Sequence, residues 1–79
     1  MRMDVVLPSM GEDAEEIATV AFWMAEVGDT VAEGDDLLEL TTDKAAFTLP
    51  SPHSGVLLEQ MVAEGNEVSV GDVLGVMET

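Results

Sequence analysis

The sequence repeats itself, and this repeat limits what the chain can fold into. Residues 18–42 align with residues 55–79 at a constant offset of 37. The shared pattern is Gly-x-x-Val-x-x-Gly-Asp-x-Leu, which starts at Gly28 in the first half and at Gly65 in the second. A chain of 79 residues is too short for two independent cores. The repeat therefore predicts one domain built from two similar halves around a pseudo-twofold axis.

A second, shorter repeat precedes the main repeat in the sequence. Leu7-Pro8-Ser9 recurs as Leu49-Pro50-Ser51, at an offset of 42. If these segments are equivalent, the first half holds about five extra residues by comparison of the two offsets. The acidic stretch Gly11–Glu16 is the expected place for them.

Short strand-like runs separated by turn residues fill both halves. Gly, Pro, Asp and Asn lie between the runs, and no stretch of helical length keeps a 3.6-residue period with caps. This pattern predicts an all-β fold, a flattened barrel or sandwich. The expected strands are Met3–Leu7, Ala18–Met24, Thr30–Val31, Leu37–Thr41, Ala46–Leu49, Val56–Val62, Glu67–Val68 and Val73–Met77.

The repeat also predicts where the chain ends lie. Under a pseudo-twofold axis, the turn from Thr41 to Ala46 has its counterpart between Met77 and Met3, where the chain begins and ends. The termini should therefore meet at one end of the domain. Lys44, in the middle of the turn, should stand at the opposite end.

Lys44 is the only lysine in a chain with seventeen acidic residues, and Arg2 is the only other basic residue. An exposed lysine in a turn is usually ordinary surface. Here no other exposed position has kept one, which indicates that the amine is retained for chemistry. The turn Thr42-Asp43-Lys44-Ala45 suits a tight reversal, and the short neighbours Asp43 and Ala45 leave the lysine side chain accessible to a modifying enzyme.

Composition excludes several classes of function. The formal net charge of −15 argues against nucleic acid and against anionic membranes as partners. The chain has no cysteine and one histidine, so neither a zinc site nor thiol chemistry is expected. No apolar run approaches the roughly 20 residues that span a bilayer. We expect a soluble intracellular protein.

Two segments of the sequence show a specific resemblance to a known family. The segment from Leu40 to Ala45, LTTDKA, and the segment from Leu49 to Val56, LPSPHSGV, resemble the lipoyl domains of 2-oxo acid dehydrogenase acyltransferase components. The likeness extends over nearly all 79 residues. Two positions depart from the family pattern: Thr41 stands where glutamate is usual, and Ala18 stands where glycine is frequent.

The resemblance implies a barrel-sandwich hybrid of two four-stranded antiparallel sheets with Lys44 at a hairpin tip. It implies that Lys44 is amide-linked to lipoic acid and that Asp43 and Ala45 help enzymes recognise the turn. The domain would hold no catalytic residue and no metal. It would present a swinging arm whose dithiolane does the chemistry.

The resemblance also implies partners. A lipoate ligase or lipoyl transferase would load Lys44, and a thiamine-diphosphate decarboxylase would acylate the arm. The arm would then deliver the acyl group to coenzyme A at the acyltransferase core and be reoxidised by a flavin dihydrolipoyl dehydrogenase. Similarity favours pyruvate or a related short-chain 2-oxo acid.

We expect residues 1–79 to be one lipoyl domain and a module of a longer chain, a dihydrolipoyllysine-residue acyltransferase. The isolated domain is expected to be monomeric. Its expected location is the cytoplasm, or the mitochondrial matrix if the source is eukaryotic.

Two other functions stay open from the residues. A biotin carrier domain of a carboxylase has a similar fold, but biotin carriers flank their lysine with methionine, whereas Lys44 lies between Asp43 and Ala45. The other open function is that of an unmodified acidic β-domain that binds a basic partner.

The stretch Gly11–Glu16 is most simply a solvated acidic loop. In the family, the corresponding loop contributes to recognition by the decarboxylase.

The charge of the chain predicts a salt dependence. Seventeen carboxylates against two basic side chains repel one another at low ionic strength, and salt screens this repulsion. The melting temperature should rise between low and moderate salt concentration, as measured by circular dichroism. A melting temperature that stays level would contradict the prediction.

Overall fold

The computed structural model describes residues 1–9 and 17–79. These residues form eight strands, and no helix among them is long and apolar enough to cross a membrane. All eight predicted strands are confirmed, with every boundary within two residues of its expected position. The strands are β1 (Arg2–Val6), β2 (Ile17–Trp23), β3 (Thr30–Val31), β4 (Asp36–Thr41), β5 (Ala46–Pro50), β6 (Gly55–Gln60), β7 (Glu67–Ser69) and β8 (Val73–Glu78).

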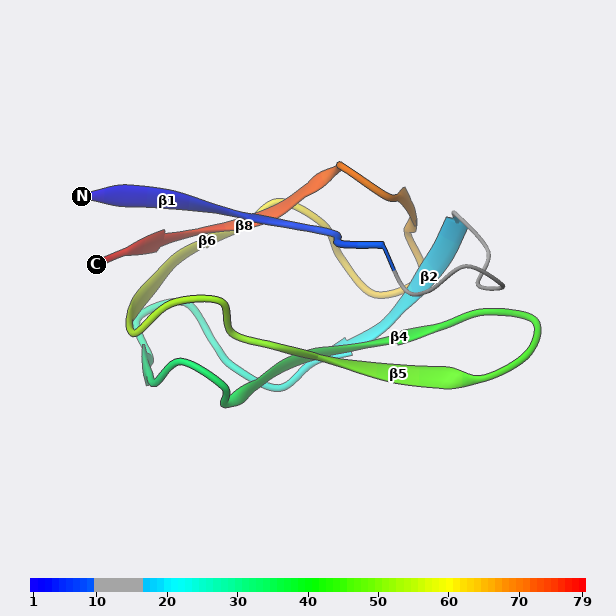
Figure 1. Ribbon diagram of the computed structural model, residues 1–79, viewed down its shortest axis with the longest axis horizontal. Coiled ribbons are helices and arrows are strands. Elements are labelled where there is room, and N and C mark those ends of the chain that lie inside the picture. Colours follow the sequence, from blue (N-terminus) through cyan, green and yellow to red (C-terminus); the bar gives the residue numbers. More distant parts are fainter. Residues whose placement is uncertain (10–16) are drawn as a thin grey trace.

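The strands form two four-stranded antiparallel sheets that face each other (Figure 1). One sheet has the order β1-β8-β6-β3, and the other has the order β5-β4-β2-β7. Read in these orders, β1, β8, β6 and β3 correspond to β5, β4, β2 and β7. Exchanging the two halves of the chain therefore converts the first strand order into the second. The predicted flattened sandwich with pseudo-twofold symmetry is therefore confirmed, in a domain measuring 33 × 22 × 18 Å.

Even the irregularities of the strand pairing are duplicated. Each of the four long strand pairs has one register shift, and each shift in one half has its counterpart in the other. Such bulges bend the strands and increase their twist, so both halves curve alike. The shifts fall between Val5 and Val6, between Val20 and Phe22, between Asp36 and Leu38, and between Leu57 and Glu59.

The register corrects one prediction. In the hairpin of β4 and β5, Leu38 lies opposite Leu49, and its counterpart Gly75 lies opposite Val5. Val5 is thus equivalent to Leu49, and the offset is 44, not 42. The Leu-Pro-Ser likeness does not mark equivalent positions: offsets of 42 and 44 differ by two residues and leave the same side chains on the same face of the sheet, so the sequence pattern does not distinguish them. The first half therefore holds seven extra residues rather than five, because the offset is 44 in β1 and 37 from β2 onward. These extra residues come between β1 and β2 in the sequence. The stretch 11–16 lies outside the described residues.

Each half closes a turn of the other half. The backbone N–H of Gly28 donates to the carbonyl oxygen of Leu57 (2.8 Å), and that of Gly65 donates to the carbonyl oxygen of Val20 (2.8 Å). These are the same bond in the two halves. The two halves therefore depend on each other for backbone hydrogen bonds, which an isolated half would lose.

The core between the sheets is aliphatic and follows the same duplication. Leu37 and Leu74 are equivalent, as are Leu40 and Met77, and all four are completely or almost completely buried. Large buried aliphatic side chains of this kind each contribute about 1.5–3 kcal/mol by burial. The largest fully buried side chains are Val5, Leu7, Val20, Leu37, Leu38, Leu40, Leu57, Leu74 and Met77.

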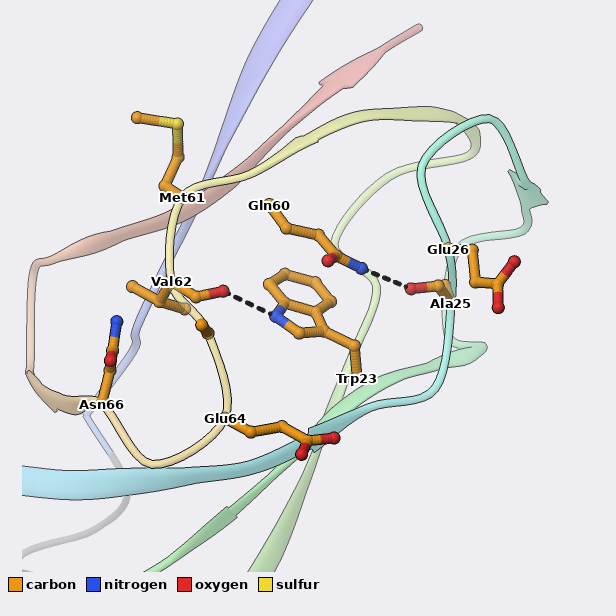
Figure 2. A pocket seen from close by; sticks show the side chains of 9 residues that line it. Trp23, Ala25, Glu26, Gln60, Met61, Val62, Glu64 and Asn66 are labelled. Carbon is orange, nitrogen blue, oxygen red and sulfur yellow. Dashed lines mark hydrogen bonds between the residues drawn. The ribbon is translucent and has the colours of Figure 1, made fainter.

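Two equivalent hydrogen bonds from side chains connect the two halves of the chain (Figure 2). The indole N–H of Trp23 donates to the carbonyl oxygen of Val62 (3.0 Å), and the side-chain amide of Gln60 donates to the carbonyl oxygen of Ala25 (2.9 Å). Trp23 and Gln60 are equivalent positions, and so are Ala25 and Val62. Both residues line a hollow of about 480 Å³. Gly75 leaves room at this point: a Cβ there would lie 2.7 Å from the carbonyl oxygen of Glu59 and 3.2 Å from the indole ring.

Gly71 tests the turn assignment. Its φ is 94°, and a Cβ added there would meet nothing within 4 Å, so substitution costs only backbone strain. Gly71→Val should lower the unfolding free energy by about 1–3 kcal/mol. Gly71→Asn should cost less, because asparagine tolerates positive φ. Urea denaturation measures both; equal midpoints for wild type and Gly71→Val would show that the turn does not require glycine.

Candidate functional site

Lys44 lies at the tip of the β4–β5 hairpin, at the end of the long axis opposite both termini (Figure 1). Its side chain is exposed, and among the described residues none pairs with its ammonium group in a hydrogen bond or a salt bridge. The prediction for the position of this lysine is confirmed. The amine is therefore open to a modifying enzyme.

The hydroxyl group of Thr42 organises the turn. It accepts hydrogen bonds from the backbone N–H of Lys44 (3.2 Å) and of Ala45 (3.3 Å), and it donates to the carbonyl oxygen of Ala45 (3.3 Å). The backbone N–H of Thr42 also donates to that carbonyl (2.9 Å). Such side-chain bonds to nearby backbone are typical of threonine in turns. Thr42 thus fixes the backbone on which Lys44 is carried.

The same pattern of hydrogen bonds joins the two termini on the opposite side of the domain. Thr79, the counterpart of Thr42, donates from its backbone N–H (2.8 Å) and from its hydroxyl (3.1 Å) to the carbonyl oxygen of Met1. Met1 is the counterpart of Ala45. The amino terminus also donates to the backbone oxygen of Thr79 (2.8 Å) and pairs with Glu78 (3.2 Å). The hairpin turn and the two termini therefore close equivalent ends of one symmetric fold.

A polar hollow of about 320 Å³ borders the attachment turn on one side. Thr42 and Asp43 from the turn line it together with Ile17 and Glu67. The carboxylates of Asp43 and Glu67 give this hollow a negative charge at neutral pH. A partner that approaches Lys44 from this side meets acidic side chains.

The other predicted site residues lie beside Lys44 as expected. Asp43 and Ala45 are both exposed, and within the described part of the chain the Asp43 carboxylate accepts no hydrogen bond. Their role in recognition stays a prediction. In residues 1–9 and 17–79, no three histidine, aspartate or glutamate side chains come together as a metal site. The place of Thr42 in a turn, where threonine and aspartate side chains bond nearby backbone amides, was predicted; the structure shows that the Thr42 hydroxyl makes these bonds.

Residues 3–77 match the sequence profile of a family described as "Biotin-requiring enzyme". This match covers almost the whole chain. The chain belongs to the biotin/lipoyl attachment family. The predicted resemblance is thereby confirmed, and Lys44 sits at the exposed hairpin tip of a domain of this family.

The proteins similar to this chain include a lipoyl domain of known structure. The solution structure of the lipoyl domain of the 2-oxoglutarate dehydrogenase complex from Azotobacter vinelandii superposes with a TM-score of 0.74 at 28% identity, covering 96% of this chain and 95% of that one. The dihydrolipoyllysine-residue acetyltransferase component of the pyruvate dehydrogenase complex from Corynebacterium glutamicum is 40% identical over 77 residues, 98% of this chain. The corresponding succinyltransferase component of the 2-oxoglutarate dehydrogenase complex from Bartonella vinsonii is 40% identical over 78 residues, 99% of this chain. The chain spans 11% and 19% of the length of these two relatives.

The hydroxyl of Thr42 should matter for modification of Lys44. Thr42→Val removes one donor and one acceptor, and neutral hydrogen bonds contribute about 0.5–1.5 kcal/mol each. We expect kcat/KM for ligase-catalysed modification to fall by about 2- to 10-fold. Thr42→Ser should restore it.

Thr79→Val is the matched control, because it removes the equivalent hydroxyl at the far end of the domain. It should leave the modification rate unchanged. Equal rates for wild type and Thr42→Val would show that the hydroxyl does not position the lysine.

Proposed function

We propose that this chain is a lipoyl carrier domain and that Lys44 is its attachment site. The proposal rests on one observation above all: the single lysine of the sequence is displayed at the end of the domain farthest from the joined termini. Family membership and the similarity to lipoyl domains support it. The domain presents a group to other enzymes and is itself a substrate rather than a catalyst.

The residues at the tip fit a covalently attached lipoyl group. Lys44 supplies an exposed amine for an amide bond, and the side chains of Asp43 and Ala45 are too short to cover it. The backbone of the turn is already fixed by Thr42, so attachment needs no rearrangement of the fold. When bound, lipoic acid supplies a dithiolane that accepts electrons and an acyl group.

The protein's own contribution is placement. Amide formation removes the charge of Lys44, so that the end of the arm becomes apolar and can enter a channel in another enzyme. The termini leave the domain at the opposite end, so a chain continuing from either of them would not obstruct the arm. Tethering in this way keeps the arm at a high local concentration near the enzymes it serves.

We assign the domain to a 2-oxo acid dehydrogenase complex, as a module of an acyltransferase chain. The partners would be a lipoate ligase or lipoyl transferase, a thiamine-diphosphate decarboxylase, the acyltransferase core and a dihydrolipoyl dehydrogenase. Similarity to both an acetyltransferase component and a succinyltransferase component supports the class of complex.

A biotin carrier is the second candidate, because the matching family includes biotin-dependent enzymes. Asp43 and Ala45 flank Lys44 here, in place of the methionines of biotin carriers. The three similar proteins described above are a lipoyl domain and two dihydrolipoyllysine-residue acyltransferase components. Both observations favour lipoic acid.

Modification of the purified domain tests the proposal. Incubation with lipoate ligase, ATP and lipoate should add one lipoyl group by intact mass, and biotin ligase with biotin should add nothing. Lys44→Arg should abolish the adduct and leave the melting temperature within a few degrees of wild type, because the side chain is exposed and, within residues 1–9 and 17–79, its ammonium group takes part in no hydrogen bond or salt bridge. A biotin adduct, or no adduct with either ligase, would reject the proposal.

A further inference from the structure

An apolar hollow of about 170 Å³ lies between the edge strand β5 and the segment that follows β1. The buried side chains of Leu7 and Leu40 line it, and so do the partly buried side chains of Phe47 and Leu49. Among the residues that the structure describes, Thr48 is the only polar one in the lining. Hollows lined in this way are where proteins bind small apolar groups.

The strand pairing explains why apolar side chains reach the surface here. Phe47 lies directly opposite the buried Leu40 in the register of β4 with β5, and Leu49 follows two residues later on the same face of the sheet. Because β5 is the edge strand of its sheet, this inner face meets the rim of the domain. Pro8 and Pro50 also line the hollow and are exposed, so the hollow opens to solvent at this rim.

The hollow begins within reach of the attachment turn. Phe47 is the second residue of β5 and the third residue after Lys44. Even a fully extended chain places the Cα atoms of these two residues at most about 11 Å apart. An amide-linked lipoyl group is joined to the lysine Cα through about eleven bonds, which span about 13 Å when extended, since three backbone bonds span 3.8 Å. The end of the arm can therefore reach the side of the hollow that Phe47 forms.

The size and the chemistry of the hollow suit the end of this arm. A dry cavity of about 150 Å³ lined by aliphatic and aromatic side chains holds benzene, so a hollow of 170 Å³ has room for a dithiolane ring. Divalent sulfur packs favourably against aromatic rings, and Phe47 supplies one. The amide-linked arm carries no charge, so its entry leaves no ionised group without a partner.

We propose that this hollow holds the dithiolane of the lipoyl arm while no other enzyme has taken it, which rests on the carrier function proposed above. The occupant is the domain's own arm because the hollow is apolar, lies within reach of Lys44 and is smaller than the roughly 300–1,000 Å³ of pockets for larger ligands. Attachment to the same domain gives the arm a high local concentration at the hollow. The arm therefore has a docked and an extended state, and other enzymes take it from the extended state.

Met3 provides a matched control for Phe47. It is the counterpart of Phe47 in the other half, and it lies opposite Met77 just as Phe47 lies opposite Leu40. Both side chains are partly buried. Met3 thus occupies the same backbone setting in β1, beside the joined termini rather than beside the arm.

Nuclear Overhauser spectroscopy of the lipoylated wild-type domain tests the proposal without any substitution. The adduct is first verified by intact mass. The ring protons of Phe47 and the methyl groups of Leu40 and Leu49 should show Overhauser contacts to the protons of the dithiolane, and the methyl group of Met3 should show none. A lipoylated domain without any contact between Phe47 and the dithiolane would overturn the proposal.

Chemical reduction of the oxidised arm gives a second measurement. A water-soluble phosphine reduces only a dithiolane that it can reach, so the rate constant follows the fraction of arms in the extended state. Phe47→Thr should raise this rate constant about two- to fivefold, and Met3→Thr should leave it unchanged. Equal rate constants for wild type and Phe47→Thr would show that Phe47 does not hold the ring. Should Phe47→Thr fail to fold, the Overhauser measurement on the wild type decides alone.

The outcomes separate docking of the arm from the carrier function. If the wild-type domain accepts lipoate but Phe47 makes no contact with the dithiolane, the arm is free in solution, the docking proposal is wrong and the carrier function stands. If the wild-type domain accepts no lipoate, both proposals fail.

Discussion

The reciprocal hydrogen bonding of the two halves is the constraint on which this structure depends. Gly28 donates to Leu57 in the other half, and Gly65 returns the same bond to Val20. Neither half can satisfy its own turn, so the fold forms as one unit or not at all. An aliphatic core shared by both sheets makes the same demand, because neither sheet can bury its inner face alone.

This symmetry explains where the function can be placed. The fold has two equivalent ends: a hairpin turn closes one, and the two termini close the other with the same threonine-to-carbonyl bonds. Lys44 stands at the first end and is thereby separated from the rest of any longer chain. The halves also serve as internal controls for each other. Where they share a buried side chain, as at Leu37 and Leu74, both copies serve the common core.

Much of this could be predicted from the sequence, since the relevant signals are local or repeated. Glycines spaced by a fixed offset predicted the turns, and Gly71 has the positive φ expected of it. The position of Lys44 opposite the termini followed from the repeat alone. The offset of β1 relative to β5 could not be predicted, because register is decided by pairing across the sheet and a short tripeptide likeness misled. The exchange of hydrogen bonds by Trp23 and Gln60 also depends on tertiary contacts between residues with no sequence similarity.

The central claim is that Lys44 carries lipoic acid in the cell. The most direct test is tandem mass spectrometry of the protein purified from its own organism. The account predicts a peptide containing Lys44 with the mass of a lipoyl group, in oxidised, reduced or acylated form, localised by fragmentation to that residue. Lys44 found unmodified throughout, or found carrying biotin, would contradict it.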